Sequence, residues 1–107
     1  MRCGSLLAHL PEQLPEELVE VLTSGTHVRI ERIVSHSHVS PPGFWYDQEW
    51  DEFVVLMAGA ARLEFEDSES VELRPGDYLV LPAHRRHRVS WTDAQQATVW
   101  LAVHYTA

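Results

Sequence analysis

Residues that favour turns divide the chain into short segments, and this division limits the folds that it can adopt. From Thr26 onward, apolar or alternating runs of strand length are separated by clusters of Gly, Pro, Asp and Ser. The expected strands cover residues 26–34, 44–48, 50–57, 61–66, 70–74, 77–81, 87–92 and 97–105. Short strands at such intervals form antiparallel barrels or sandwiches, so the sequence predicts one all-β domain over residues 26–107.

One turn in this pattern predicts a backbone conformation. In Arg74-Pro75-Gly76-Asp77, proline occupies the position that fixes φ and glycine follows it, as a type II turn requires. We therefore expect a positive φ at Gly76.

Residues 1–25 are expected to form an N-terminal segment that contains one short helix. Pro15 suits a first helical turn, and Glu16 and Glu17 lie where the helix dipole favours negative charge. Leu18, Val21 and Leu22 would then share one face, and Gly25 would end the helix. The sequence predicts that this helix, at residues 15–22, lies against the domain.

Charge and cysteine content exclude several classes of function. The chain has 8 Arg, no Lys and 16 acidic residues, and its formal net charge of -8 opposes binding to nucleic acid or anionic membranes. Without lysine there is no Schiff-base chemistry. Cys3 is the only cysteine, so no internal disulfide is possible and a reducing cytoplasm is expected. The apolar stretch 6–10 is too short for a signal peptide or a membrane span.

Alternation along residues 45–57 indicates which side chains point into the domain. Alternate residues of a strand point to the same face, and the face that carries Val54 and Leu56 is the better candidate for the interior. The other residues of this parity are Tyr46, Gln48, Trp50 and Glu52. A buried carboxylate or amide without a partner costs on the order of several kcal/mol, so Gln48 and Glu52 need a metal, a ligand or another side chain.

The opposite parity of the same stretch carries Phe53, Val55 and Met57. Apolar side chains on the outside of a strand need a cover, and a second copy of the chain would supply one. The sequence therefore predicts a homodimer; the alternative is that the helix at 15–22 covers them within one monomer.

Two spaced sets of residues resemble a known family. Six residues separate Glu52 from Gly59; further on, Gly76 is followed by Pro82, His87 and Trp91. This spacing, with Leu73-Arg74-Pro75-Gly76-Asp77-Tyr78, resembles the two-motif signature of the cupin superfamily over residues 43–91. The resemblance implies an antiparallel double-stranded β-helix, or jelly-roll barrel, that holds a site inside.

In that superfamily, two histidines and a glutamate of the first motif and a histidine of the second bind one metal. Glu52 and His87 match these positions, and Tyr46 and Gln48 replace the two histidines of the first motif. The resemblance thus implies a divalent metal (Fe, Mn, Ni or Zn) held by Gln48, Glu52 and His87. Tyr46 and His84, which occupies a glycine position of the second motif, are the candidates for moving protons.

Parity and spacing also predict where other aromatic and charged residues lie. Trp50 and Trp91, the latter at an asparagine position of the motif, have the parity to line a substrate pocket. His36 and His38 lie too far before Glu52 to match the motif and are expected at a polar strand end. His104 is expected to face outward if Leu101 and Val103 face inward. The arginines beside His87 (Arg85, Arg86 and Arg88) are expected on a solvated or interface face; the alternative is that they draw an anionic substrate toward the barrel mouth.

Three functions fit these residues. The first is a metal-dependent dioxygenase, isomerase or lyase that acts on a small oxygen-bearing molecule. The second is a non-catalytic module that binds or senses a small ligand. The third is a metal-free acid–base enzyme that uses Glu52 and His87. Fold alone does not choose between them.

Overall fold

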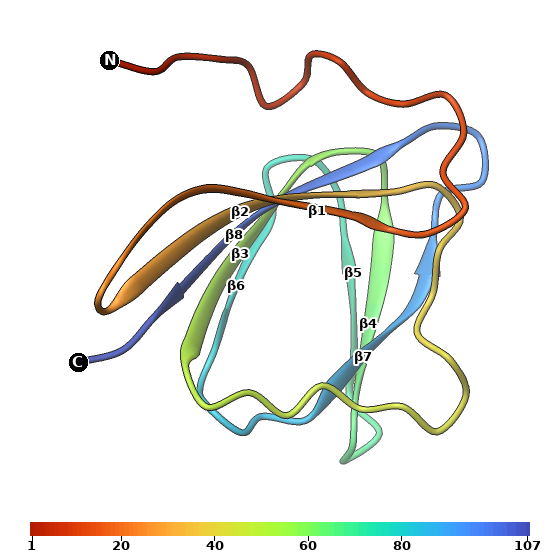
Figure 1. The fold of residues 1–107 in the computed structure, drawn as a ribbon. Helices are drawn as coiled ribbons and strands as arrows, with labels where there is room; N and C mark the ends of the chain where they lie inside the picture. The colour runs from red at the N-terminus through yellow and green to blue at the C-terminus, as the bar shows by residue number, and fades with distance from the viewer.

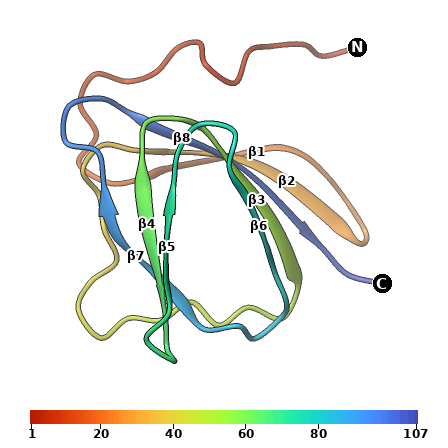
Figure 2. The same ribbon diagram turned by 180° about the vertical axis from the view of Figure 1, so that it is seen from behind.

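The computed structural model describes residues 1–107 and consists of β-strands without a helix (Figure 1). The strands are β1 Leu18–Gly25, β2 Val28–Ser35, β3 Asp51–Ala58, β4 Ala61–Phe65, β5 Ser70–Leu73, β6 Tyr78–Leu81, β7 His87–Thr92 and β8 Thr98–Tyr105. All pairings are antiparallel, in a five-stranded sheet of order β1-β2-β8-β3-β6 and a three-stranded sheet of order β5-β4-β7. Figure 2 shows from behind how the smaller sheet faces the larger one. The predicted all-β antiparallel fold is confirmed.

The predicted helix at residues 15–22 is wrong, because residues 18–25 form strand β1. This strand pairs with β2 from Leu18↔Val34 to Gly25↔Val28, with a bulge between Val21 and Thr23. Pairing satisfies the backbone groups along the free edge of β2, and Val19 and Val21 are β-branched residues that suit a strand. The acidic first turn and the leucine spacing favour a helix only in the absence of that partner.

Residues 44–48 also differ from the prediction, since they form no regular strand. They cross the end of the barrel as an irregular segment held by one isolated bridge between Tyr46 and His87. The Tyr46 amide donates to the His87 carbonyl at 2.7 Å, and the His87 amide donates to the Tyr46 carbonyl at 3.2 Å. This bridge holds Tyr46 over the start of β7.

The hydrophobic core lies between the two sheets. On β3 the inward side chains are Glu52, Val54 and Leu56, as the parity of the sequence predicts, and all three are buried. Val54 and Leu56 belong to the core cluster, together with Ala61, Leu63, Phe65, Leu73, Leu81, Trp100 and Ala102. Each fully buried leucine contributes roughly 1.5–3 kcal/mol.

Two glycines occupy conformations that other residues rarely adopt. Gly76 has a φ of 95°, and the Asp77 amide donates to the Arg74 carbonyl at 2.9 Å, so the predicted positive φ is confirmed. Gly59, between β3 and β4, has a φ of 85°, and a Cβ there would lie 2.6 Å from the Cα of Thr98. The β3–β4 turn therefore has no room for a side chain at Gly59.

The N-terminal segment runs along the top of the molecule in Figure 1 and is tied to the outer face of the large sheet. Arg32, buried on β2, forms an ion pair with Glu20 of β1. Its guanidinium also donates to the carbonyls of Leu6, at 3.2 Å, and Ala8, at 2.7 Å. The chain contains no long apolar helix of the kind that crosses a bilayer.

Candidate functional site

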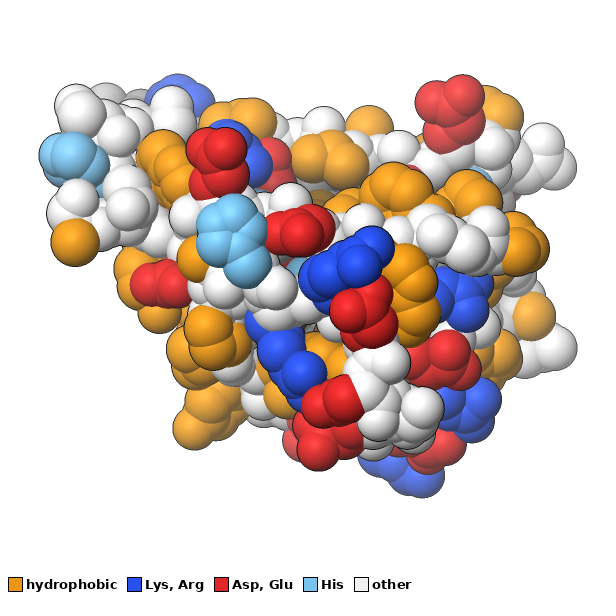
Figure 3. All heavy atoms as spheres, turned by 90° about the horizontal axis from the view of Figure 1, so that it is seen from below, with side chains coloured by type: hydrophobic (Ala, Val, Ile, Leu, Met, Phe, Trp, Pro, Cys, Tyr) orange, Lys and Arg blue, Asp and Glu red, His pale blue; other side chains and the backbone are white.

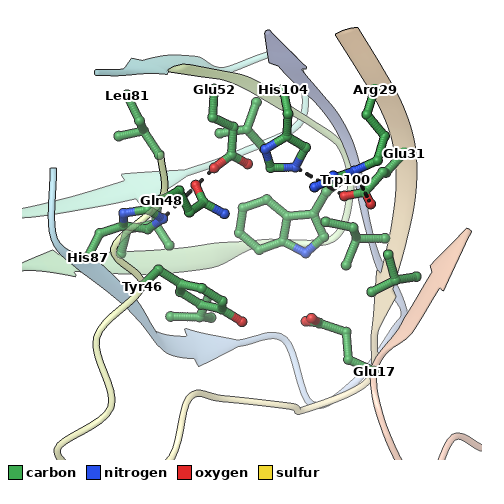
Figure 4. A pocket seen from close by; sticks show the side chains of 15 residues that line it. Glu17, Arg29, Glu31, Tyr46, Gln48, Glu52, Leu81, His87, Trp100 and His104 are labelled. Atoms are coloured by element: carbon green, nitrogen blue, oxygen red, sulfur yellow. Dashed lines mark hydrogen bonds and ion pairs between the residues drawn. The ribbon is translucent and has the colours of Figure 1, made fainter. Parts of the chain in front are cut away.

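A cavity of about 180 Å³ opens between the two sheets at the end crossed by residues 44–48 (Figure 4). Its polar lining consists of Glu17, Arg29, Glu31, Tyr46, Gln48, Glu52, His87 and His104. Its apolar lining consists of Val19, Ile33, Val54, Leu63, Leu81, Val89 and Trp100. The barrel thus encloses a small hollow with an apolar wall and several ionisable groups, which is the usual character of a ligand site.

Glu52 is the most perturbed acid of this cavity. Its side chain is only 9% exposed, and the nearest cationic candidate is His87, whose Nε2 lies 4.0 Å from Oε1. That separation is too long for a hydrogen bond, so the buried carboxylate has no strong partner in the protein. Burial, and then the charge of Glu31, raise the pKa of Glu52 to about 7, while Arg29 opposes this change.

His87 faces Glu52 from the other side of the barrel with a fixed ring. Its Nδ1 lies 2.7 Å from the carbonyl of Arg85, which can only accept, so Nδ1 carries the proton and Nε2 presents a lone pair to the cavity. Burial lowers the pKa of His87, which keeps the ring neutral near pH 7. The Tyr46 ring stacks on the imidazole with centroids 5.4 Å apart, which further restrains its orientation.

Tyr46 and Gln48 enter the cavity from the irregular segment before β3. Besides the Tyr46 bridge to His87, the Gln48 carbonyl accepts from the His84 amide at 2.7 Å, so the segment is fixed at both residues. Burial, then the charges of Glu17 and Glu52, raise the pKa of Tyr46 above its ordinary value. The phenol therefore keeps its proton and can donate a hydrogen bond to a ligand.

A second carboxylate–imidazole pair, Glu31 and His104, was not expected from the sequence. His104 Nε2 lies 3.0 Å from Glu31 Oε1, and the Arg29 Nε donates to Glu31 Oε2 at 2.9 Å. Burial lowers the pKa of His104, although Glu31 opposes the change. Glu52 and His104 are direct neighbours across β3 and β8, so both pairs share one cavity.

The prediction that His104 faces outward is wrong, because the inward side chains of β8 are Trp100, Ala102 and His104. Apolar residues occupy both faces of β8, so alternation along that strand alone gives no direction. His104 lies opposite Arg29 of β2, so its direction follows from strand pairing that no local pattern of the sequence gives.

Three predicted site residues lie outside this cavity. Trp91 is 42% exposed, because a bulge at Ser90 places it opposite Arg62 on the outer face of the small sheet. Trp50 lines a separate hollow beside Glu49 and His104. The His84 side chain is 65% exposed, and its Nδ1 lies 2.7 Å from Asp47 Oδ1.

The other histidines and arginines considered from the sequence lie outside the cavity. His36 and His38 interact with each other, through a 2.8 Å hydrogen bond from the His36 amide to His38 Nδ1, in the turn after β2. Figure 3 shows acidic and basic side chains interleaved at one end of the molecule. The arginines beside His87 form ion pairs: Arg85 with Asp67 and Glu69, Arg86 with Glu66, and Arg88 with Glu64.

The expected metal ligands come together only in part. Glu52, His87 and Gln48 line one cavity, but they offer one imidazole, one carboxylate and one neutral amide. Nowhere in the chain do three His, Cys, Asp or Glu side chains converge in a way that could hold a metal ion. This donor set does not fit a resident divalent metal, which protein sites usually bind through at least three strong donors.

Comparison with known proteins assigns the family. The cupin domain model matches residues 31–104, more than half of the sequence, so the chain belongs to the cupin family. A candidate mannose-6-phosphate isomerase from Ralstonia eutropha JMP134 is 47% identical, with a TM-score of 0.96 and full coverage of both chains. No curated protein matched the sequence.

Two more distant structures share the fold. An RmlC-like cupin from Methanocaldococcus jannaschii, with a double-stranded β-helix, is 18% identical with a TM-score of 0.69 and coverage of 90% of this chain and 85% of that one. The polyketide cyclase RemF from Streptomyces resistomycificus is 18% identical with a TM-score of 0.71 and coverage of 85% and 66%. The cupin barrel predicted from the two motifs is confirmed.

Proposed function

We propose that the protein catalyses proton transfer at a carbon next to a carbonyl group, in a small molecule bound inside the barrel, with Glu52 as the base. The observation that carries this proposal is the state of Glu52: a buried carboxylate that faces a cavity and lacks a hydrogen-bond partner. Its pKa of about 7 is the value at which one group both takes and returns a proton near neutral pH.

The neighbouring groups suit the two oxygens of an α-hydroxycarbonyl compound. Tyr46, whose phenol stays protonated, would donate to the carbonyl oxygen and stabilise the negative charge that develops there. His87 Nε2 would accept a hydrogen bond from the adjacent hydroxyl group. A ligand oxygen beside these two groups could form a hydrogen bond with each of them, because their facing atoms are 4.0 Å apart and are not bonded to each other.

The proposed step balances within these residues. Glu52 takes the proton from carbon, and the electron pair of the C–H bond forms a carbon–carbon double bond while the carbonyl oxygen becomes an enolate oxygen that accepts a hydrogen bond from Tyr46. Return of the carboxyl proton to the same carbon restores the starting compound. For return to the neighbouring carbon, the adjacent hydroxyl group passes its proton through His87 Nε2 to the former carbonyl oxygen, so the new carbonyl forms at the hydroxyl-bearing carbon and each protein group regains its starting state. Return to the neighbouring carbon is isomerisation, the reaction type in the name of the Ralstonia relative.

Deuterium exchange tests the proposal without knowledge of the substrate. A panel of small α-hydroxyketones and 1,3-dicarbonyl compounds is incubated with protein in D₂O, and loss of the C–H signal is followed by proton NMR. We expect accelerated exchange for part of the panel, and a loss of roughly 10²–10⁴-fold in Glu52→Gln. Glu72→Gln, which changes an exposed carboxylate paired with Arg62, is the matched control and should behave like the wild type.

Four outcomes would contradict this function. No acceleration by the wild type, or equal acceleration by Glu52→Gln, would remove Glu52 as the base. Exchange that stops with EDTA and returns with Fe, Mn, Ni or Zn would support the metal-dependent function instead, with Gln48, Glu52 and His87 as its ligands. Saturable binding without exchange would indicate the non-catalytic binding module.

A further inference from the structure

The lining of the cavity carries more acidic than basic side chains. Three carboxylates line it, from Glu17, Glu31 and Glu52, against one arginine. The Arg29 Nε already donates to Glu31 Oε2 at 2.9 Å, so part of its charge is neutralised. His87 and His104 are both buried, and burial disfavours the charged form of an imidazole by lowering its pKa. No free cation faces the interior.

The nearby arginines do not change this balance. Arg85 and Arg86 are held by acidic partners on the outer surface, at Asp67, Glu69 and Glu66. A phosphate or carboxylate group that entered the cavity would lose its hydration and would meet carboxylates instead of compensating charge. An anion is therefore the class of ligand that this cavity disfavours most.

The size and wall of the cavity define the rest of the ligand. Leu63, Leu81 and Val89 form part of an apolar wall, and the volume is about 180 Å³. An apolar cavity of roughly 150 Å³ holds a benzene ring, so a six-membered ring with one polar substituent fits. The unpartnered Glu52 carboxylate then lies where that substituent can reach it.

We propose that the cavity selects a ring-sized molecule that is uncharged or carries an amine, and excludes phosphorylated and carboxylated compounds. This inference rests on the proposed function, because it places the ligand against Glu52. The expected ligand also differs from the sugar phosphate in the name of the Ralstonia relative, because that compound is an anion. An amine would pair with the Glu52 carboxylate, and a hydroxyl group would donate to it.

Three probes of one shape test the selection: benzyl alcohol, benzylamine and benzoate, titrated into ¹⁵N-labelled protein at pH 7.5. We expect saturable shifts of amide signals around the cavity with the alcohol and the amine, and none with benzoate. Glu52→Gln should weaken benzylamine binding about tenfold and change benzyl alcohol binding much less, because only the amine gains from the charge. Glu72→Gln should match the wild type.

Benzoate that binds as tightly as benzylamine would overturn the selection, as would the absence of binding by all three probes. These results are independent of turnover. If the probes bind in the expected order but no compound exchanges deuterium, the ligand class stands and the proposed catalysis fails. If exchange occurs but benzoate binds as well as the amine, the catalysis stands and the ligand class fails.

Discussion

The ionisation of Glu52 should make the protein less stable as the pH rises. Its pKa is about 7 in the folded state, against 4.5 for an ordinary glutamate, so the folded protein binds this proton more tightly than the unfolded chain does. The associated stability is fully present below pH 4.5 and is lost progressively between pH 4.5 and about 7. Each pKa unit corresponds to about 1.36 kcal/mol, so the loss is on the order of 3 kcal/mol.

Urea unfolding of wild type and Glu52→Gln at several values of pH between 4.5 and 8.5 measures this loss. The variant lacks the titrating group, so its free energy of unfolding relative to the wild type should rise by about 3 kcal/mol across the range, and its relative Tm by on the order of 10 °C. Glu72→Gln provides the control: Arg62 lowers the pKa of Glu72 below its ordinary value, so this carboxylate stays ionised over the range and its variant should show no comparable dependence on pH. A wild-type-to-Glu52→Gln difference that does not depend on pH would refute the reasoning.

Further predictions concern the turns and the outer surface. Gly76→Ala should lower the free energy of unfolding by about 1 kcal/mol, because alanine is strained at the positive φ of this position. Gly59→Ala should lower it further, because its Cβ would also clash with Thr98. Thermal unfolding with equal Tm values for both variants and the wild type would contradict this. We propose that the outer face of β3 and β6 pairs two copies of the chain, because Tyr78 and Val80 are 62% and 55% exposed beside Phe53. Light scattering at micromolar concentration should give twice 12.3 kDa for the wild type and a lower mass for Val80→Glu; a monomeric wild type would contradict it.

The sequence predicted most of the barrel because its strands carry local signals. Turn residues bound seven of the eight strands, and the Pro75-Gly76 pair specifies its turn. Strand β1 was mistaken for a helix because its charge pattern suits a helical first turn, whereas its structure depends on the distant edge of β2. A local sequence pattern does not predict pairing with a distant strand.

The positions of the site residues could be predicted where side chains alternate regularly along a strand, and not where a bulge or two apolar faces remove that signal. Alternation along β3 correctly placed Glu52 inward, and the motif spacing correctly placed His87 opposite it. Trp91 was misplaced because the bulge at Ser90 reverses the faces after it, and no residue near Ser90 signals that bulge. His104 was misplaced because both faces of β8 are apolar. Its pairing with Glu31 requires knowledge of which strands are neighbours.

The pKa of the Glu52 side chain tests the account most directly. With glutamate labelled by ¹³C at the side-chain carboxyl, the Glu52 signal is identified by its loss in Glu52→Gln and is followed as a function of pH. We expect a midpoint of about 7, and a shift of that midpoint to lower pH when benzylamine is bound, because a cation favours the carboxylate. A midpoint near 4.5 would show that Glu52 is an ordinary solvated acid, and the proposed base would be lost with it.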